Sequence, residues 1–150
     1  MKLVILDYSG TLSLASVIFA SPERLSSELE RCGLKRLGVL TCEMFWEAVV
    51  NPTWQEGSTT AAGYKEVMKK ILREAFHLDA SVVSPAAESF VDAYLAASKI
   101  DPSWKPVFET MNFHPGVKTI IASDHYAEAT DAILDSLSDM GINAAALHDP

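Results

Sequence analysis

The sequence predicts an α/β fold in which a parallel sheet core is interrupted by a long inserted block of helices. Residues 3–6 form a short apolar run that ends in a glycine-containing turn, a pattern typical of a strand buried on both faces. Residues 22–111 show helical patterns only, and residues 117–147 then return to a strand, a helix and a strand. This order indicates a sheet core with an inserted helical domain.

The helical block begins at Ser21 and Pro22, because serine is a preferred N-cap and proline fits the first helical position. The helices are expected at residues 22–32, 42–50, 61–77, 85–98 and 102–111. The third has the clearest apolar face, formed by Tyr64, Val67, Met68, Ile71, Leu72 and Ala75. We expect the tryptophans of this block, Trp46, Trp54 and Trp104, to be packing residues.

The pattern changes again after Pro115 and Gly116. A strand is expected at residues 117–122, an amphipathic helix at 126–140 and a further strand at 142–147. We therefore assign residues 1–16 and 101–150 to the α/β core and residues 17–100 to the helical domain.

Composition excludes several classes of function. The chain has 12 basic and 20 acidic residues, a net charge of −8 and no basic run, so a nucleic-acid partner is not expected. Cys32 and Cys42 lack the spacing of a zinc site or a disulfide framework, which favours a reducing, cytoplasmic setting. Asp7 interrupts the apolar N-terminal region, so neither piece reaches the roughly 18 residues needed to span a membrane.

The first chemical motif follows the first expected strand directly. It reads Asp7-Tyr8-Ser9-Gly10-Thr11-Leu12. A carboxylate at a strand end can attack phosphorus or carbon, glycine permits a tight turn, and backbone N–H groups with the Thr11 hydroxyl can hold an anion. The same residue types also form ordinary surface turns, so this motif alone leaves both interpretations open.

The second motif is Ser123-Asp124, which follows the second expected strand. It places the Ser123 hydroxyl at the end of that strand. Ser123 can act as the N-cap of the following helix, which does not exclude a second role for its hydroxyl. The sequence contains no P-loop, no Gly-x-Ser-x-Gly elbow and no Gly-x-Gly-x-x-Gly loop.

Together, the two motifs resemble those of the haloacid dehalogenase superfamily of hydrolases. The resemblance implies a Rossmann-like core with a helical cap inserted after the first motif, and a Mg²⁺-dependent phosphohydrolase that acts on a small phosphorylated metabolite. Asp7 would be the nucleophile, Ser9 the second catalytic position, and Asp7 with the Ser9 backbone carbonyl the metal ligands. The phosphate-binding residues would be Gly10, Thr11, Ser123 and Asp124.

The chain departs from this family at two points. Ser9 stands where family phosphatases usually carry a second aspartate, and serine is a far weaker acid. From Thr119 to Pro150 there is no lysine or arginine, and no later strand carries the family's acidic residues. We therefore expect a fragment, or a sheet whose open edge is covered by a second copy, a partner chain or an unusual segment.

Three hypotheses follow from these motifs. The first is the Mg²⁺-dependent phosphohydrolase. The second is a catalytically impaired relative that serves as a binding or assembly module, which the missing basic and acidic residues favour. The third is a 2-haloacid dehalogenase in which Asp7 attacks carbon, although Ser9 replaces the aromatic residue that dehalogenases have there.

Overall fold

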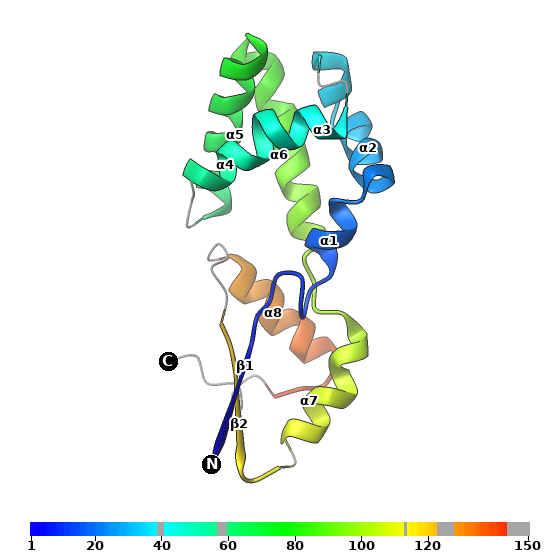
Figure 1. Cartoon of the computed structure of the whole chain (residues 1–150), viewed down its shortest axis with the longest axis vertical. Helices are drawn as coiled ribbons and strands as arrows, with labels where there is room; N and C mark the ends of the chain where they lie inside the picture. Colours follow the sequence, from blue (N-terminus) through cyan, green and yellow to red (C-terminus); the bar gives the residue numbers. More distant parts are fainter. Residues whose placement is uncertain (39–40, 57–59, 113, 123–127, 144–150) are drawn as a thin grey trace. The chain divides into compact units, whose positions relative to one another are not determined.

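The structure is a computed structural model that describes residues 1–38, 41–56, 60–112, 114–122 and 128–143 (Figure 1). The chain divides into two compact units. Met1–Val17 and Ser98–Pro150 form the first, called the strand unit here, and Ile18–Ala97 form the second, called the helical unit. The junctions between the units thus follow Val17 and precede Ser98. The sequence pattern predicted them after residue 16 and before residue 101.

The strand unit contains two parallel strands, β1 (Lys2–Leu6) and β2 (Val117–Ile121). Their register places Leu3 opposite Lys118 and Leu6 opposite Ile121. The helices of this unit are η3 (Pro102–Trp104, 3-10), α7 (Lys105–Asn112) and α8 (Glu128–Asp139). The fold is therefore mixed α/β with a two-stranded parallel sheet among the described residues, whereas the Rossmann-like core stays a prediction.

One face of β1 is more open than the sequence pattern predicted. Leu3 is 55% exposed and Ile5 is 60% exposed, so the expectation of a strand buried on both faces is wrong for the described residues. Helix α7 lies on the opposite face, where the buried Thr119 hydroxyl contacts the Met111 sulfur at 3.6 Å. An apolar run predicts a buried strand only if layers cover both faces, and the described residues cover one.

The helical unit consists of short helices and two longer ones, α5 and α6, around a shared apolar core. Helix α1 (Ala15–Phe19) crosses the junction into it, and the remaining elements are α2 (Pro22–Arg31), η1 (Leu34–Leu37, 3-10), α3 (Cys42–Phe45), η2 (Trp46–Val50, a π-helix), α4 (Asn51–Glu56), α5 (Ala61–Phe76) and α6 (Ala80–Ala97). Aromatic packing marks the core, with the Phe90 ring centroid 5.3 Å from Phe19 in an edge-to-face pair and 4.8 Å from Phe45 in a tilted pair. The core is thus built from helices far apart in the sequence.

Side-chain caps explain where two of these helices begin. The Ser21 hydroxyl accepts a hydrogen bond from the Arg24 N–H at 3.4 Å, and Pro22 occupies the first position of α2, as predicted. The Thr60 hydroxyl caps α5 by accepting from the Gly63 N–H at 3.0 Å. Met68, Ile71 and Leu72 of α5 are buried, which confirms the predicted apolar face at these positions.

Two helices differ from their expected bounds at prolines. Helix α6 begins at Ala80 and contains Pro85 in its interior, whereas a helix starting at residue 85 was expected. The Asp79 carboxylate accepts from the Ser81 N–H at 2.8 Å and so provides an earlier cap. The helix expected at 42–50 continues to Glu56, with the π-helical turn η2 directly before Asn51-Pro52. Pro52 has no backbone N–H to donate to the preceding helical turn. The wider π-helical turn lets the helix continue past this missing hydrogen bond.

The C-terminal strand expected at 142–147 is not seen in its described part. Ile142 and Asn143 lie outside any strand. The Ile142 N–H donates to the Leu137 carbonyl at 2.8 Å and Gly141 has a φ of 74°, so these residues cap the C-terminal end of α8. Residues 144–150 lie outside the described residues. Within the part of the chain that the structure describes, no helix is long and apolar enough to cross a membrane.

Candidate active site

Asp7 lies directly after β1, and its side chain is exposed to solvent. Its Oδ2 accepts a hydrogen bond from the Thr11 hydroxyl at a long distance of 3.4 Å. A carboxylate has about four acceptor positions, so this contact leaves most of its capacity open. Ligands of parallel α/β sheets bind beyond the carboxyl ends of the strands, and Asp7 is at such an end.

The turn after Asp7 is closed by its own backbone hydrogen bonds. The Ser13 N–H donates to the Tyr8 carbonyl at 2.9 Å, and the Gly10 N–H donates to the Ser13 carbonyl at 2.8 Å. Gly10 has a φ of 81°, a left-handed conformation that favours glycine at this position. The Gly10 N–H is therefore engaged within the turn in this structure, and its predicted contact with a bound phosphate requires that bond to open.

The second expected site position, Ser123, follows the neighbouring strand β2 in the sequence. The ladder ends at Leu6 and Ile121, and the Ala122 N–H donates to the Leu6 carbonyl at 2.9 Å. The carboxyl ends of β1 and β2 thus lie at the same edge of the sheet. Ser123 and Asp124 lie outside the described residues, so their proximity to Asp7 stays a prediction.

The donor atoms expected to hold Mg²⁺ are the Asp7 carboxylate and the Ser9 carbonyl. Both are hard oxygen donors of the kind that Mg²⁺ takes, usually with one or two carboxylates, waters and substrate phosphate. Ser9 is half-buried, and no described residue donates a hydrogen bond to its carbonyl. Among the described residues, no group of three His, Cys, Asp or Glu side chains is placed to hold a metal ion. By donor chemistry the two oxygens suit part of a Mg²⁺ ligand set, and Mg²⁺ binding stays a prediction.

A set of contacts that the sequence did not indicate holds this turn in place. Three hydrogen bonds join the turn to the segment that re-enters the strand unit at Ser98. They run from the Tyr8 hydroxyl to the Ser98 carbonyl at 2.5 Å, from the Asp101 N–H to the Leu12 carbonyl at 2.8 Å, and from the Trp104 indole N–H to the Thr11 carbonyl at 3.2 Å. Trp104 thus has a polar partner beyond the packing role expected for it, and no local pattern indicates a contact across 93 positions.

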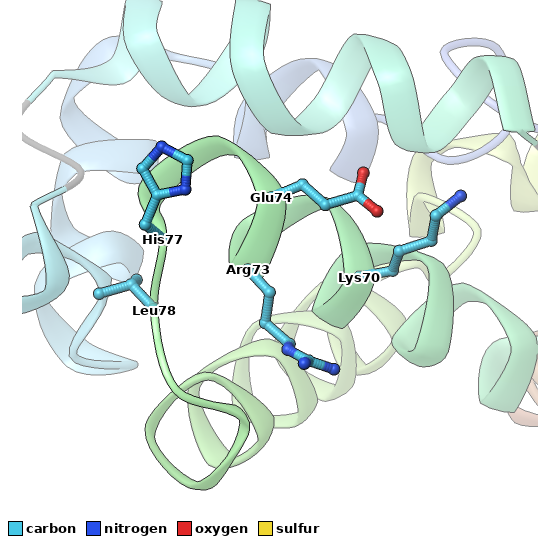
Figure 2. Close-up of a pocket in the computed structure, with 5 residues that line it drawn as sticks. All are labelled: Lys70, Arg73, Glu74, His77 and Leu78. Carbon is cyan, nitrogen blue, oxygen red and sulfur yellow. The ribbon is translucent and has the colours of Figure 1, made fainter.

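A separate pocket of about 350 Å³ lies on the helical unit (Figure 2). It is lined by Lys70, Arg73, Glu74, His77 and Leu78, at the C-terminal end of α5. The Lys70 ammonium is already held by both carboxylate oxygens of Glu56, at 2.9 and 3.1 Å, and the hydrogen bond raises the pKa of Lys70. The pocket therefore combines both charge signs on an exposed helix face.

Comparison of the chain with protein-family models, curated proteins and solved structures finds no match. The function of the chain is therefore inferred from the residues of the site.

Proposed function

We propose that this chain is a haloacid-dehalogenase-like hydrolase, a Mg²⁺-dependent phosphohydrolase that acts on small phosphorylated metabolites through an aspartyl-phosphate on Asp7. The observation that carries the proposal is the exposed Asp7 carboxylate at the carboxyl end of a strand in a parallel pair. The glycine-dependent turn and the Thr11 hydroxyl beside Asp7 add support. The helical unit between β1 and β2 is proposed to act as the cap.

In the proposed first step, an Asp7 carboxylate oxygen attacks phosphorus, and the bond from phosphorus to the leaving-group oxygen breaks. The leaving group departs with that electron pair, and Asp7 holds the phosphoryl group. Water then attacks phosphorus, which releases phosphate and restores the Asp7 carboxylate. The Thr11 hydroxyl, which now donates to Asp7, is placed to donate to a phosphoryl oxygen instead.

Mg²⁺, when bound, supplies positive charge that offsets the negative charge of the phosphoryl oxygens. The Asp7 carboxylate and the Ser9 carbonyl are the described atoms proposed to hold it. Ser9 offers only a weakly acidic hydroxyl where a carboxylic acid would protonate the leaving group, which costs roughly 10²–10⁴-fold in rate. Substrates whose leaving groups need no proton, such as acyl phosphates and nitrophenyl phosphate, are therefore preferred over alkyl phosphates.

The test compares acetyl phosphate and nitrophenyl phosphate with glycerol phosphate, with and without Mg²⁺. Asp7→Asn keeps the shape of the side chain but removes the nucleophile, so we expect it to abolish Mg²⁺-dependent turnover. Asp135→Asn, a change of the same kind at an exposed position of α8, should leave turnover unchanged. Alkyl-phosphate hydrolysis that persists in Asp7→Asn would refute the mechanism.

A second candidate is a binding or assembly module on the same fold. It is favoured by the exposed apolar face of β1, formed by Leu3 and Ile5, and by the absence of lysine and arginine from Thr119 onward in the sequence. In this case the chain would associate with a second copy or a partner chain at this exposed face of the sheet and would not hydrolyse phosphate esters. Self-association without phosphate release distinguishes this candidate from the phosphohydrolase.

We also propose a cytoplasmic location. Cys32 and Cys42 are both free thiols, and burial raises the pKa of the Cys32 thiol, which keeps it in the unreactive protonated form. Free cysteines suit a reducing compartment. Fractionation of the native host cell, with the chain detected by antibody, tests this location.

A further inference from the structure

The segment from Ser98 to Trp104 lies along the turn that carries Asp7. After the helical unit, the chain re-enters the strand unit at Ser98, and within seven residues it bonds three times to the turn of residues 8–12. Tyr8 is fully buried, so its hydroxyl bond to the Ser98 carbonyl is shielded from water. Shielded hydrogen bonds are costly to open, which makes this a firm attachment.

Asp101 sets the geometry of this segment in two ways. Its backbone N–H donates to the Leu12 carbonyl, while its Oδ1 accepts from the Ser103 N–H at 2.8 Å and so caps η3. The hydrogen bonds from the Ser103 hydroxyl and the Ser103 N–H hold the pKa of Asp101 below its ordinary value, so the cap is charged at neutral pH. Pro102 follows at the first helical position, where its fixed φ suits the start of a helix.

This helix start places Trp104 against the turn. The half-buried indole donates its N–H to the Thr11 carbonyl, and its ring lies 6.2 Å from the ring of Phe108. Phe108 is almost fully buried, so the indole rests on the core of the strand unit. The Thr11 backbone is therefore held from the core side while the Thr11 hydroxyl points to the Asp7 carboxylate.

We propose that Trp104 is a positioning residue for the candidate active site, whose indole N–H holds the Thr11 carbonyl and so fixes the Thr11 hydroxyl against the Asp7 carboxylate. This inference rests on the proposed function, because it assigns Trp104 a purpose only if Asp7 reacts. The Trp104 side chain contacts a backbone atom of the turn, the Thr11 carbonyl oxygen. Its role is to hold the turn that carries Asp7 in one conformation before substrate arrives.

The test uses the full chain with Trp104→Phe, which keeps an aromatic ring and removes the N–H. The matched control is Trp46→Phe, the same change in the helical unit, where Trp46 packs against that unit's core. The three hydrogen bonds between the turn and the segment from Ser98 to Trp104 are called the brace here. Tyr8→Phe removes a second of these bonds and replaces Trp104→Phe in the test if that variant folds poorly. Asp7→Asn reports separately on the proposed function.

Two readouts are needed. Amide hydrogen exchange of Gly10, Ser13 and Asp101 measures how often the braced turn opens. Losing one hydrogen bond should speed this exchange by about two- to tenfold in Trp104→Phe and Tyr8→Phe, and leave it unchanged in Trp46→Phe. The kcat for acetyl phosphate should fall by about the same factor in the first two variants only, because an open turn misplaces Asp7.

Unchanged exchange in both brace variants overturns the inference, whatever happens to turnover. Faster exchange with unchanged kcat also overturns it, because the brace then does not serve Asp7. Equal turnover in the wild-type chain and in Asp7→Asn refutes the proposed function instead, and exchange still shows whether Trp104 holds the turn.

Discussion

Replacement of Phe90 tests whether aromatic packing holds the helical unit together. Phe90 is 6% exposed, and its ring packs edge-to-face on Phe19 and at a tilt on Phe45. Phe90→Leu keeps an apolar side chain but loses both ring pairs, each worth about 0.5–1.5 kcal/mol, so we expect a loss of about 1–3 kcal/mol in the free energy of unfolding. Phe90→Ala also leaves a cavity and should cost about 3–5 kcal/mol.

The assay is urea unfolding followed by far-ultraviolet circular dichroism, fitted with separate transitions if the two units unfold independently. Val82→Ala is the control, because Val82 lies on the same helix with 46% of its surface exposed and should change stability by less than about 0.5 kcal/mol. A Phe90→Leu variant as stable as wild type, or a Val82→Ala variant destabilised as much, would refute the reasoning that these ring pairs stabilise the unit.

Two further predictions concern the strand unit. If the exposed sheet face of Leu3 and Ile5 mediates association, sedimentation velocity should show concentration-dependent dimers that Ile5→Lys abolishes. Val82→Lys, at an exposed apolar site of the helical unit, should leave the dimers intact. Equal loss of dimers in both variants would argue against this face. For pH, hydrogen bonds from Ser103 lower the folded-state pKa of Asp101 below its ordinary 3.8, so its contribution to stability is full above pH 3.8 and is lost as pH falls through the lower folded value. Asp101→Asn retains a capping oxygen but cannot titrate in this range, so its unfolding free energy should fall less steeply below pH 3.8 than that of wild type; identical slopes in acid urea titrations would contradict this.

The local elements followed from the sequence because their causes are local. The serine before Pro22 and the apolar spacing along residues 61–77 are properties of neighbouring residues, and α2 and α5 lie where these signals placed them. The β1 and β2 strands were predicted from apolar runs in the same way. The prediction was wrong at Pro85, because the Asp79 cap allowed the helix to begin at Ala80, before the proline.

The candidate site likewise has features with local causes, which the sequence indicated, and features with distant causes, which it did not. The sequence identified Asp7 and its turn, since a carboxylate, a glycine and a hydroxyl after a strand form a local pattern with chemical meaning. It did not indicate that Trp104 would hold the Thr11 carbonyl, because the two residues are 93 positions apart and a tryptophan in a helical block usually packs. Only the folded chain brings them together.

What the sequence determined alone is therefore the type of the elements with clear local signals, such as α2, α5, β1 and β2, and the candidate residues for chemistry. The tertiary structure decided the rest: the parallel register that pairs Leu6 with Ile121, the exposure of Leu3 and Ile5, and the engagement of the Gly10 N–H within its own turn. Periodicity and capping act over a few residues, whereas strand pairing, burial and hydrogen-bond partners depend on which distant segments come into contact.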